Sequence, residues 1–198
     1  MGSWAGNTRR RRGSSVTGVR KGLAKVEVAL RWDPSPAGTP ANDLDIVAAV
    51  YAAADPHGAP VQLVHFGSRS PDGTITLNRD SHTGQGFGFD EVMTVELHRM
   101  AADKGRVVIG VVIQDSGAGT GRGAEGTKTF ADVAGTGFRI REGYTDLAQG
   151  DFAGVSGASA ATVAEFTRDA SGAWSFHLRL EGFDADPEEF TRAMGGVR

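Results

Sequence analysis

The sequence predicts an all-β protein, a β-sandwich of two packed and mostly antiparallel sheets with long loops and a short C-terminal helix. Short runs of alternating apolar and polar residues recur along the chain, as at Val26, Val28 and Leu30, and this period of two is typical of strands with one buried face. Glycine accounts for 29 of the 198 residues, and glycine-containing turns separate the runs. The pattern indicates no long helix. Many short strands joined by turns favour a sandwich.

Nine segments have the pattern of strands. Two of them, 46–51 and 107–113, are almost wholly apolar, as expected of strands that are covered on both faces. The nine segments are 26–30, 46–51, 61–66, 75–77, 93–97, 107–113, 138–140, 162–166 and 174–180. The pair 75–77 and 93–97 is expected to form a long hairpin.

Two segments have helical composition. Residues 98–105 are expected to form a single helical turn. Residues 184–194 are expected to form a short amphipathic helix, with Pro187 at its first position, where the missing amide of proline costs no hydrogen bond.

The composition is that of a globular protein with one domain. Hydrophobic residues make up 39% of the chain and charged residues 23%, and 198 residues are enough to bury a core. The absence of cysteine excludes disulfides and cysteine-based zinc or redox sites, and it agrees with a reducing compartment. No apolar run approaches the ~18 residues of a membrane span, and no apolar signal-peptide stretch opens the chain. We therefore expect a cytoplasmic location.

Residues 1–15 are expected to form a disordered basic arm in front of a single domain at 16–198. The arm carries Arg9, Arg10, Arg11 and Arg12 among glycine, serine and asparagine, which bury little. The run is short and has no aromatic residues to stack on bases, which favours a solvated tail. Contact with nucleic acid or another anionic surface is the alternative.

The segment 78–91, NRDSHTGQGFGFDE, combines crowded carboxylates with glycines at alternate positions. Such a segment suits neither a helix nor a central strand, and its acids need a counter-charge. Ca²⁺ collects about 6–8 oxygen ligands from carboxylates and backbone carbonyls. Upstream, two acids lie two residues apart on an expected strand and project to the same side. A calcium site is therefore predicted from the carboxylates of Asp43, Asp45, Asp80, Asp90 and Glu91.

Four segments of the chain share their order and spacing with one known family. They are VRKGLAKVEVALRW, NDLDIVAAVY, SPDGTITLNRDSHTGQGFGFDEVMTVEL and GAWSFHLRLEGF, and the similarity runs over most of residues 18–182. In these segments the chain resembles the TerD-like family of tellurium-resistance, calcium-binding stress proteins. The resemblance implies two packed sheets with Ca²⁺ at one end. It also implies a calcium-dependent interaction module with a protein partner, which belongs to the stress response and is not an enzyme.

The family's loop pattern is roughly Gly-Asp-Asn-x-Thr-Gly-x-Gly-x-Gly-Asp-Asp-Glu, and residues 79–91 align with it. Ser81 and the carbonyl of Gly84 are weaker candidate ligands. Arg79 stands where the family has glycine, Ser81 where it has asparagine, and Phe89 where it has an acid. The resemblance implies one or two Ca²⁺ ions, and the missing acid argues against the second.

Other functions compete with this one. In the first alternative, the metal site is degenerate and the arginine arm binds an acidic partner or nucleic acid. In the second, the paired carboxylates are the acid and base of a hydrolase, which needs one raised pKa in an apolar cleft. A third signal, GRGAEG at 121–126, matches GxGxxG but precedes a strand-like segment, 127–130, where a dinucleotide site needs a helix. A flexible loop is expected there.

Three further loop residues have two interpretations each. His82 lies inside the acidic loop and is expected to be an exposed residue, with a pH-sensitive neighbour of the cation as the alternative. Phe87 and Phe89 are expected to pack beneath the loop, and an exposed contact for a partner is the alternative.

Overall fold

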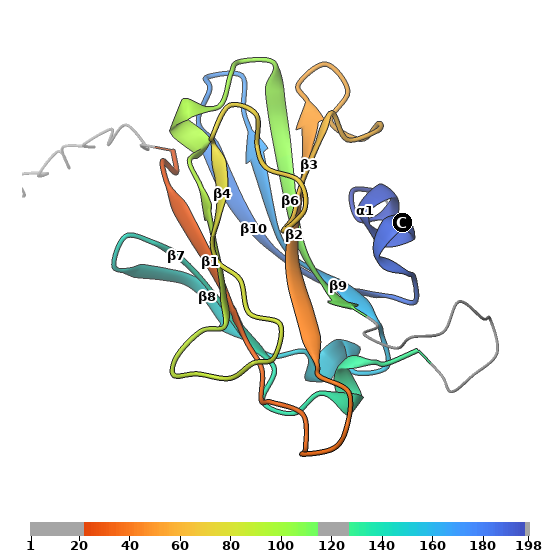
Figure 1. Ribbon diagram of the computed structural model, residues 1–198. Helices are drawn as coiled ribbons and strands as arrows, with labels where there is room; N and C mark the ends of the chain where they lie inside the picture. Colours follow the sequence, from red (N-terminus) through yellow and green to blue (C-terminus); the bar gives the residue numbers. More distant parts are fainter. Residues whose placement is uncertain (1–21, 115–126, 197–198) are drawn as a thin grey trace, which may run out of the picture.

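Two five-stranded sheets pack face to face in the computed structural model, which describes residues 22–114 and 127–196 (Figure 1). Every pair of neighbouring strands is antiparallel. The predicted β-sandwich is therefore confirmed. The predicted arm at 1–15 and the glycine-rich motif at 121–126 lie outside the described residues.

The first sheet has the strand order β4-β5-β1-β7-β8. In its middle strand, Val26, Val28 and Leu30 are buried as the sequence predicts and Glu27 is half-buried, but Ala29, which was expected to alternate with them, is buried too. The bounds of the five strands are β4 Ile75–Arg79, β5 Glu91–Val95, β1 Val26–Arg31, β7 Gly137–Glu142 and β8 Thr145–Gly150.

The second sheet has the order β10-β9-β6-β2-β3. Its two longest apolar strands, β2 and β6, lie side by side and are buried along almost their whole length, which explains their nearly continuous apolar sequences. The bounds are β10 Trp174–Phe183, β9 Ala160–Arg168, β6 Lys104–Gln114, β2 Asp43–Ala52 and β3 Gln62–Val64. Strand β3 pairs only with residues 48–50 of β2, so the first half of β2 has a free edge on that side.

The main core lies between the sheets and is made by the inward residues of both. A second, smaller core lies on the outer face of the second sheet beneath helix α1, Pro187–Ala193. Phe190 and Met194 there contact the sheet beside Tyr51. The helix begins as predicted with Pro187, because the Asp186 side chain caps it by accepting a hydrogen bond of 2.8 Å from the Glu189 amide.

Several local predictions are wrong. Residues 98–105 are not one helical turn: a 3-10 helix covers Leu97–Arg99, and β6 starts at Lys104 because its ladder with β2 extends that far. Residues 127–130 are not strand-like but lead into a 3-10 helix, Phe130–Asp132, whose start is fixed by a capping box of Thr129 and Asp132. Strand β8 was not predicted, because its largely exposed sequence has no apolar alternation.

Within residues 22–114 and 127–196, no helix is long and apolar enough to cross a bilayer. Helix α1 has only seven residues.

Candidate metal centre

The candidate site forms where the free edge of β2 meets the loop between β4 and β5. Strand β2 belongs to one sheet and β5 to the other, and Glu91 bridges them: its Oε2 accepts a hydrogen bond of 2.6 Å from the Ile46 amide. That amide is free for Glu91 because β3 stops before reaching it. The short edge strand therefore makes the opening in which the acids gather.

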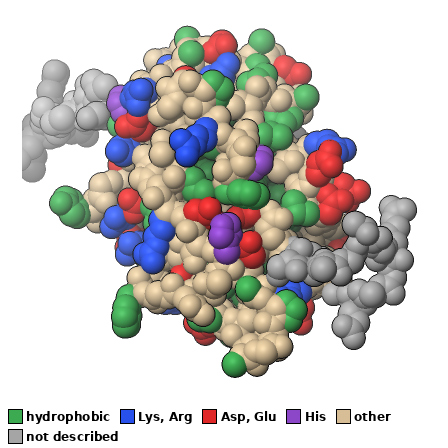
Figure 2. Space-filling model, in the orientation of Figure 1, with side chains coloured by type: hydrophobic (Ala, Val, Ile, Leu, Met, Phe, Trp, Pro, Cys, Tyr) green, Lys and Arg blue, Asp and Glu red, His purple; other side chains and the backbone are tan. Residues whose placement is uncertain are grey.

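Three of the predicted acids come together here. One carboxylate oxygen each of Asp45, Asp80 and Glu91 lies within 4.8 Å of the others, and we call this group the acidic triad. Asp45 and Glu91 are buried, while Asp80 is exposed and opens the group to the surface. Figure 2 shows acidic side chains gathered beside a histidine near the middle of this face.

Buried oxygens of the triad lack partners. Oδ1 of Asp45 and Oε1 of Glu91 are inaccessible to solvent and accept no hydrogen bond from any described residue. Oδ1 of neighbouring Asp43 is also buried and also accepts no such hydrogen bond. A buried polar atom without a partner costs about 1–3 kcal/mol. Two things can supply the missing donors: a proton held by Glu91, which lies within hydrogen-bonding reach of Asp45 and Asp80, or a cation bound among the three carboxylates. The donor set, all carboxylate oxygen, fits a hard divalent cation.

The pKa values of the two buried acids of the triad are raised. Burial raises the pKa of Glu91 to about 10, although the Ile46 amide opposes the rise, and the charges of Asp45 and Asp80 raise it further. Burial also raises the pKa of Asp45 to about 6. Nε2 of Gln114 donates a 2.5 Å hydrogen bond to Oδ2 of Asp45, which lowers this pKa but does not cancel the rise. Without a cation, Glu91 is therefore protonated at neutral pH. A bound divalent ion would reverse this preference.

Asp43 and His82 form the rim of the site. Nδ1 of His82 lies 3.3 Å from Oδ2 of Asp43, and its Nε2 lies 3.7 Å from Oδ2 of Asp80. The two carboxylates raise the pKa of His82, while burial raises the pKa of Asp43. His82 is exposed, as expected, and it also lies directly beside the predicted ligands.

The other predicted ligands lie elsewhere in the loop. Asp90 fastens the loop to β1, because its Oδ2 accepts from the Trp32 amide at 3.0 Å and its own amide donates to the Leu30 carbonyl at 2.8 Å. Gly84 is buried against Trp32, and Ser81 is half-buried. None of these three belongs to the acidic triad, and their roles as ligands stay predictions.

Sequence reasoning missed two polar neighbours of the site. Gln114, at the end of β6, pairs with Asp43 in the ladder and reaches Asp45 with its amide. Asn42 accepts from Nε1 of Trp32 through its carbonyl at 2.9 Å and from Nζ of Lys128 through its side chain at 3.0 Å. Neither residue has a sequence signal, since both contacts join segments that are far apart in the chain.

The two loop phenylalanines behave differently. Phe87 is fully exposed, so the expectation that it packs beneath the loop is wrong. It sits between two glycines with positive φ, Gly86 at +149° and Gly88 at +93°. Phe89 is half-buried and lies beneath the guanidinium of Arg139, 4.5 Å from the ring centroid.

Comparisons with family models and with known proteins identify the same family. The TerD domain model matches residues 10–192, a span that contains the whole acidic triad. A tellurium resistance protein TerD from Alcaligenes sp is 26% identical over 166 residues, with 82% of each chain covered. A tellurium resistance protein TerD from Serratia marcescens is 25% identical over 175 residues, with 85% of this chain and 86% of the relative covered.

Two crystal structures resemble the chain over nearly all of its length. One is of a protein of unknown function, with 56% identity and a TM-score of 0.83, and the match covers 90% of this chain and 100% of that chain. The other is of a homologue of the telluride resistance protein TerD from Streptomyces coelicolor A3(2), with 51% identity and a TM-score of 0.83; it covers 89% of this chain and 100% of that chain.

Proposed function

This chain belongs to the TerD domain family, and we propose that it is a calcium-binding stress-response protein that acts as a Ca²⁺-dependent interaction module and not as a catalyst. One observation carries the proposal: Asp45, Asp80 and Glu91 place carboxylate oxygens within 4.8 Å of one another, and one buried oxygen each of Asp45 and Glu91 accepts no hydrogen bond from a described residue. The names of the two TerD relatives support a role in tellurium resistance.

The chemistry of the donors favours Ca²⁺ over other divalent cations. Zinc prefers nitrogen and sulfur ligands, and the chain has no cysteine. Mg²⁺ needs near-ideal octahedral geometry and keeps several waters, whereas Ca²⁺ accepts irregular sets of oxygens. The triad with Asp43 at its rim is such an irregular set, and it comes from three separate segments of the chain.

The position of the site suggests how cation binding would change the surface. Glu91 and Asp80 stand at the two ends of the loop that carries Phe87, and Asp45 belongs to the opposite sheet. When bound, the ion would supply the positive charge that neutralises the crowded carboxylates and ties the loop to β2. Phe87, fully exposed on that loop, would then be held in one place as an apolar contact for a protein partner.

A non-catalytic role is supported by the spacing of the acids. An inverting glycosidase keeps its two carboxyl groups about 6.5–9.5 Å apart, so that a water molecule fits between them. The triad is closer than that. Its buried members also accept hydrogen bonds from the Ile46 amide and the Gln114 side chain, which fix them in place.

Calcium titration by calorimetry, with thermal melting in parallel, tests the proposal. The metal-stripped protein is expected to bind Ca²⁺ with a Kd of about 10⁻⁷–10⁻⁵ M, and calcium at one hundred times Kd should add about 2.7 kcal/mol to the free energy of unfolding. Glu91→Gln and Asp45→Asn should lose both effects. Asp146→Asn, which removes an exposed acid on β8, is the matched control and should keep both.

The outcome also separates this function from its alternatives. No heat and no shift in melting temperature up to millimolar calcium would refute the cation site. Deletion of residues 1–15 tests the arginine arm: a variant that binds calcium normally but has lost its partner would favour the arm as the binding element.

A further inference from the structure

A hollow opens between strands β3 and β4, at the side of the sandwich where both sheets end. β4 is the outer strand of the first sheet and β3 the outer strand of the second, and the two follow each other along the chain (Figure 1). Each pairs with only one described strand, so the gap between them is not closed by a ladder. The hollow has a volume of about 410 Å³, within the range of about 300–1,000 Å³ that small-molecule sites occupy.

The floor of this hollow is apolar. Val64 of β3 and Ile75 of β4 are buried and Leu77 is half-buried, while Phe66, which also lines the hollow, is 53% exposed. Val64 and Ile75 both belong to the main core, so the hollow reaches the core between the two sheets. In Figure 2, hydrophobic side chains lie directly above the acids and the histidine on this face. The apolar part of a ligand would therefore be removed from water here.

Arg69 brings to the hollow a positive charge that has no partner among the described residues. It lies in the connection between β3 and β4, it is exposed, and its side chain forms no ion pair or hydrogen bond with them. The nearest acid along the chain is Asp72. Its Oδ1 accepts from the hydroxyl groups of Ser70 and Thr74 and from the Thr74 amide, and Asp72 does not line the hollow. The guanidinium of Arg69 is therefore free to bind a negatively charged group of a ligand.

The acid of the hollow lies at its other end. Oγ of Ser70 lies 3.4 Å from Oγ1 of Thr74, which places neighbouring Arg69 near the start of β4, whereas Asp80 directly follows the end of that strand. Asp80 also belongs to the acidic triad, and Nε2 of His82 lies 3.7 Å from its Oδ2. An anionic group would be attracted to the Arg69 end and repelled from the Asp80 end, so the two charges would orient a ligand along β4.

His65 adds a hydrogen-bond donor to the lining of the hollow. Its Nδ1 accepts from the Gly67 amide at 3.2 Å, and a neutral imidazole that accepts at one nitrogen carries its proton on the other. Nε2 is therefore a donor, and it has no hydrogen-bond partner among the described residues. The ring packs edge-on against Phe66, with 5.7 Å between the ring centroids, which limits the directions in which this donor can point.

We propose that this hollow binds a small carboxylic acid with a short aliphatic chain, its carboxylate on the guanidinium of Arg69 and its chain over Val64, Ile75 and Leu77. A guanidinium and a carboxylate match in shape and form paired, charge-assisted hydrogen bonds. An apolar floor with a few polar groups that fix the orientation of the ligand is the usual form of a small-molecule site. The proposal does not depend on the cation, because Asp80 is the only member of the triad that lines the hollow.

Calorimetric titration of the full chain with three probes tests this proposal. Hexanoate carries both parts of the ligand, hexanol only the chain, and acetate only the charge. Hexanoate is expected to bind saturably at millimolar concentration or below, and hexanol and acetate at least tenfold more weakly. The titrations are carried out in chelator, so that a cation at Asp80 does not contribute to the result.

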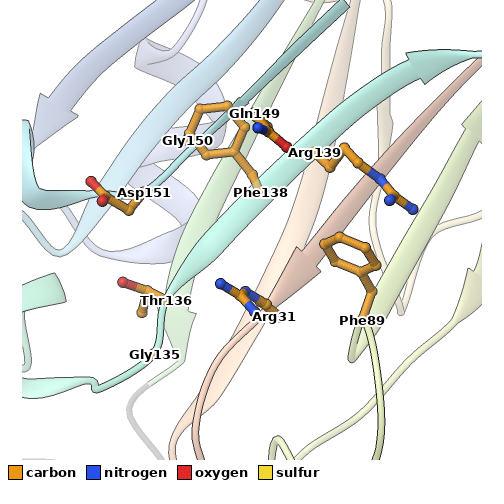
Figure 3. Close-up of a pocket in the computed structure, with 9 residues that line it drawn as sticks. All are labelled: Arg31, Phe89, Gly135, Thr136, Phe138, Arg139, Gln149, Gly150 and Asp151. Carbon is orange, nitrogen blue, oxygen red and sulfur yellow. The ribbon is translucent and has the colours of Figure 1, made fainter. Parts of the chain in front are cut away.

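Two variants separate the contributions of the charge and the chain. Arg69→Gln should weaken hexanoate binding about tenfold or more, as expected for the loss of a charge-assisted hydrogen bond, and should leave hexanol binding unchanged. Because Arg69 has no partner to lose, this variant should melt as the parent does. Phe66→Ala should weaken the binding of hexanoate and hexanol alike, since it removes apolar contact surface. Arg31→Gln is the matched control: Arg31 is also exposed, but it lines a different hollow with Phe89 and Asp151 (Figure 3).

Each contrary outcome overturns a stated part of the proposal. The absence of saturable hexanoate binding at millimolar concentrations would overturn the site. Equal weakening by Arg31→Gln would show a general charge effect and would do the same. Equal affinity for hexanoate and hexanol would overturn the role of Arg69, and equal affinity for hexanoate and acetate would overturn the role of the apolar floor. The calcium titration should be unchanged in Arg69→Gln, so this site and the calcium site can fail independently.

Discussion

The amide of Ile46 donates a hydrogen bond of 2.6 Å to Oε2 of Glu91, and this contact joins the two sheets at the acidic triad. It leaves Oε1 of Glu91 buried without a partner. One oxygen of this carboxylate therefore links the two sheets, and the other is left without a donor from the described residues. A cation bound at the triad, as proposed, would therefore be linked to the packing of β2 against β5.

Glu91→Gln should separate these two roles. Burial raises the pKa of Glu91 to about 10, so the metal-free protein already carries a neutral side chain at pH 7, and glutamine keeps the acceptor for Ile46. We expect the free energy of unfolding in chelator to change by less than about 1 kcal/mol. The stabilisation by calcium should disappear. Urea denaturation with chelator and with calcium measures both quantities.

Glu91→Ala is the contrasting variant. It removes the acceptor as well as the charge, which leaves the Ile46 amide unpaired inside the protein. In chelator, the free energy of unfolding should fall by about 2–4 kcal/mol, because the variant leaves an unpaired donor and a cavity. Equal stability of the alanine and glutamine variants would show that the Ile46–Glu91 bond does not contribute.

Calcium binding should release protons. With the pKa of Glu91 raised to about 10, the metal-free site holds a proton on Glu91 at pH 7, and Asp45, with a pKa of about 6, holds one for a small part of the time. A cation needs both groups ionised. Binding at pH 7 should therefore release about one proton from Glu91, and more at pH 6. Titration in two buffers with different ionisation enthalpies gives this number, and a value of zero would contradict the assignment of Glu91 as a ligand.

The sequence was sufficient for the sandwich and for the acids of the triad. Apolar residues at every second position, such as Val26, Val28 and Leu30, predict the face of a strand that points into the core. In β1 these three side chains are buried. The crowded acids of the loop were recognisable because like charges close in sequence need a counter-charge. Asp45 and Glu91 were both named as ligands, although nothing in the sequence gives the distance between two segments so far apart.

The sequence was insufficient wherever the register of distant strands decides the contact. Asp90 looks equivalent to Glu91, yet its carboxylate accepts from the amide of Trp32, just after β1, and stays outside the triad. Gln114 reaches Asp45 only because β2 and β6 pair as they do. Strand β8 is polar and largely exposed, so its pairing with β7 leaves no apolar pattern.

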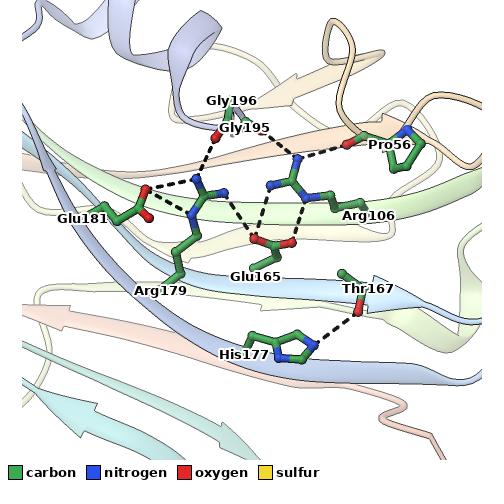
Figure 4. Close-up of polar contacts among 9 residues, drawn as sticks. All are labelled: Pro56, Arg106, Glu165, Thr167, His177, Arg179, Glu181, Gly195 and Gly196. Carbon is green, nitrogen blue, oxygen red and sulfur yellow. Dashed lines mark hydrogen bonds and ion pairs between the residues drawn. The ribbon is translucent and has the colours of Figure 1, made fainter. Parts of the chain in front are cut away.

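The Glu165 carboxylate should make stability depend on pH. It lies between Arg106 and Arg179, whose guanidiniums also donate to the carbonyls of Gly195 and Gly196 and so fasten the segment after α1 to the sheet (Figure 4). Burial alone would raise the pKa of Glu165, but the two arginines outweigh it and the pKa is lowered. Arg106 is buried, with 2% of its side chain exposed.

A lowered pKa means that the ionised form stabilises the fold. This contribution is complete above the ordinary glutamate value of 4.5 and is lost as the pH falls through the lowered pKa of the folded state. Glu165→Gln should therefore destabilise the protein by about 3 kcal/mol at neutral pH, since it leaves the Arg106 charge buried and unpaired. The difference from the parent should shrink below pH 4.5. Melting curves between pH 3 and pH 7 test this, and a difference that is constant over the range would contradict it.

Gly84→Ala should disturb both the loop and the metal site. Gly84 has a φ of +64°, and a Cβ there would lie 2.6 Å from the indole of Trp32 and 2.9 Å from its carbonyl oxygen. Gly143, in the turn between β7 and β8, has a similar φ of +58° but open space around it. Alanine at Gly143 should cost about 1–2 kcal/mol, the strain of the left-handed backbone alone. Alanine at Gly84 should cost more and should weaken calcium binding, because Trp32 also contacts Asp90 and Asn42 beside the triad. Equal losses of stability in the two variants, with unchanged calcium affinity, would show that the contact between Gly84 and Trp32 does not position the loop.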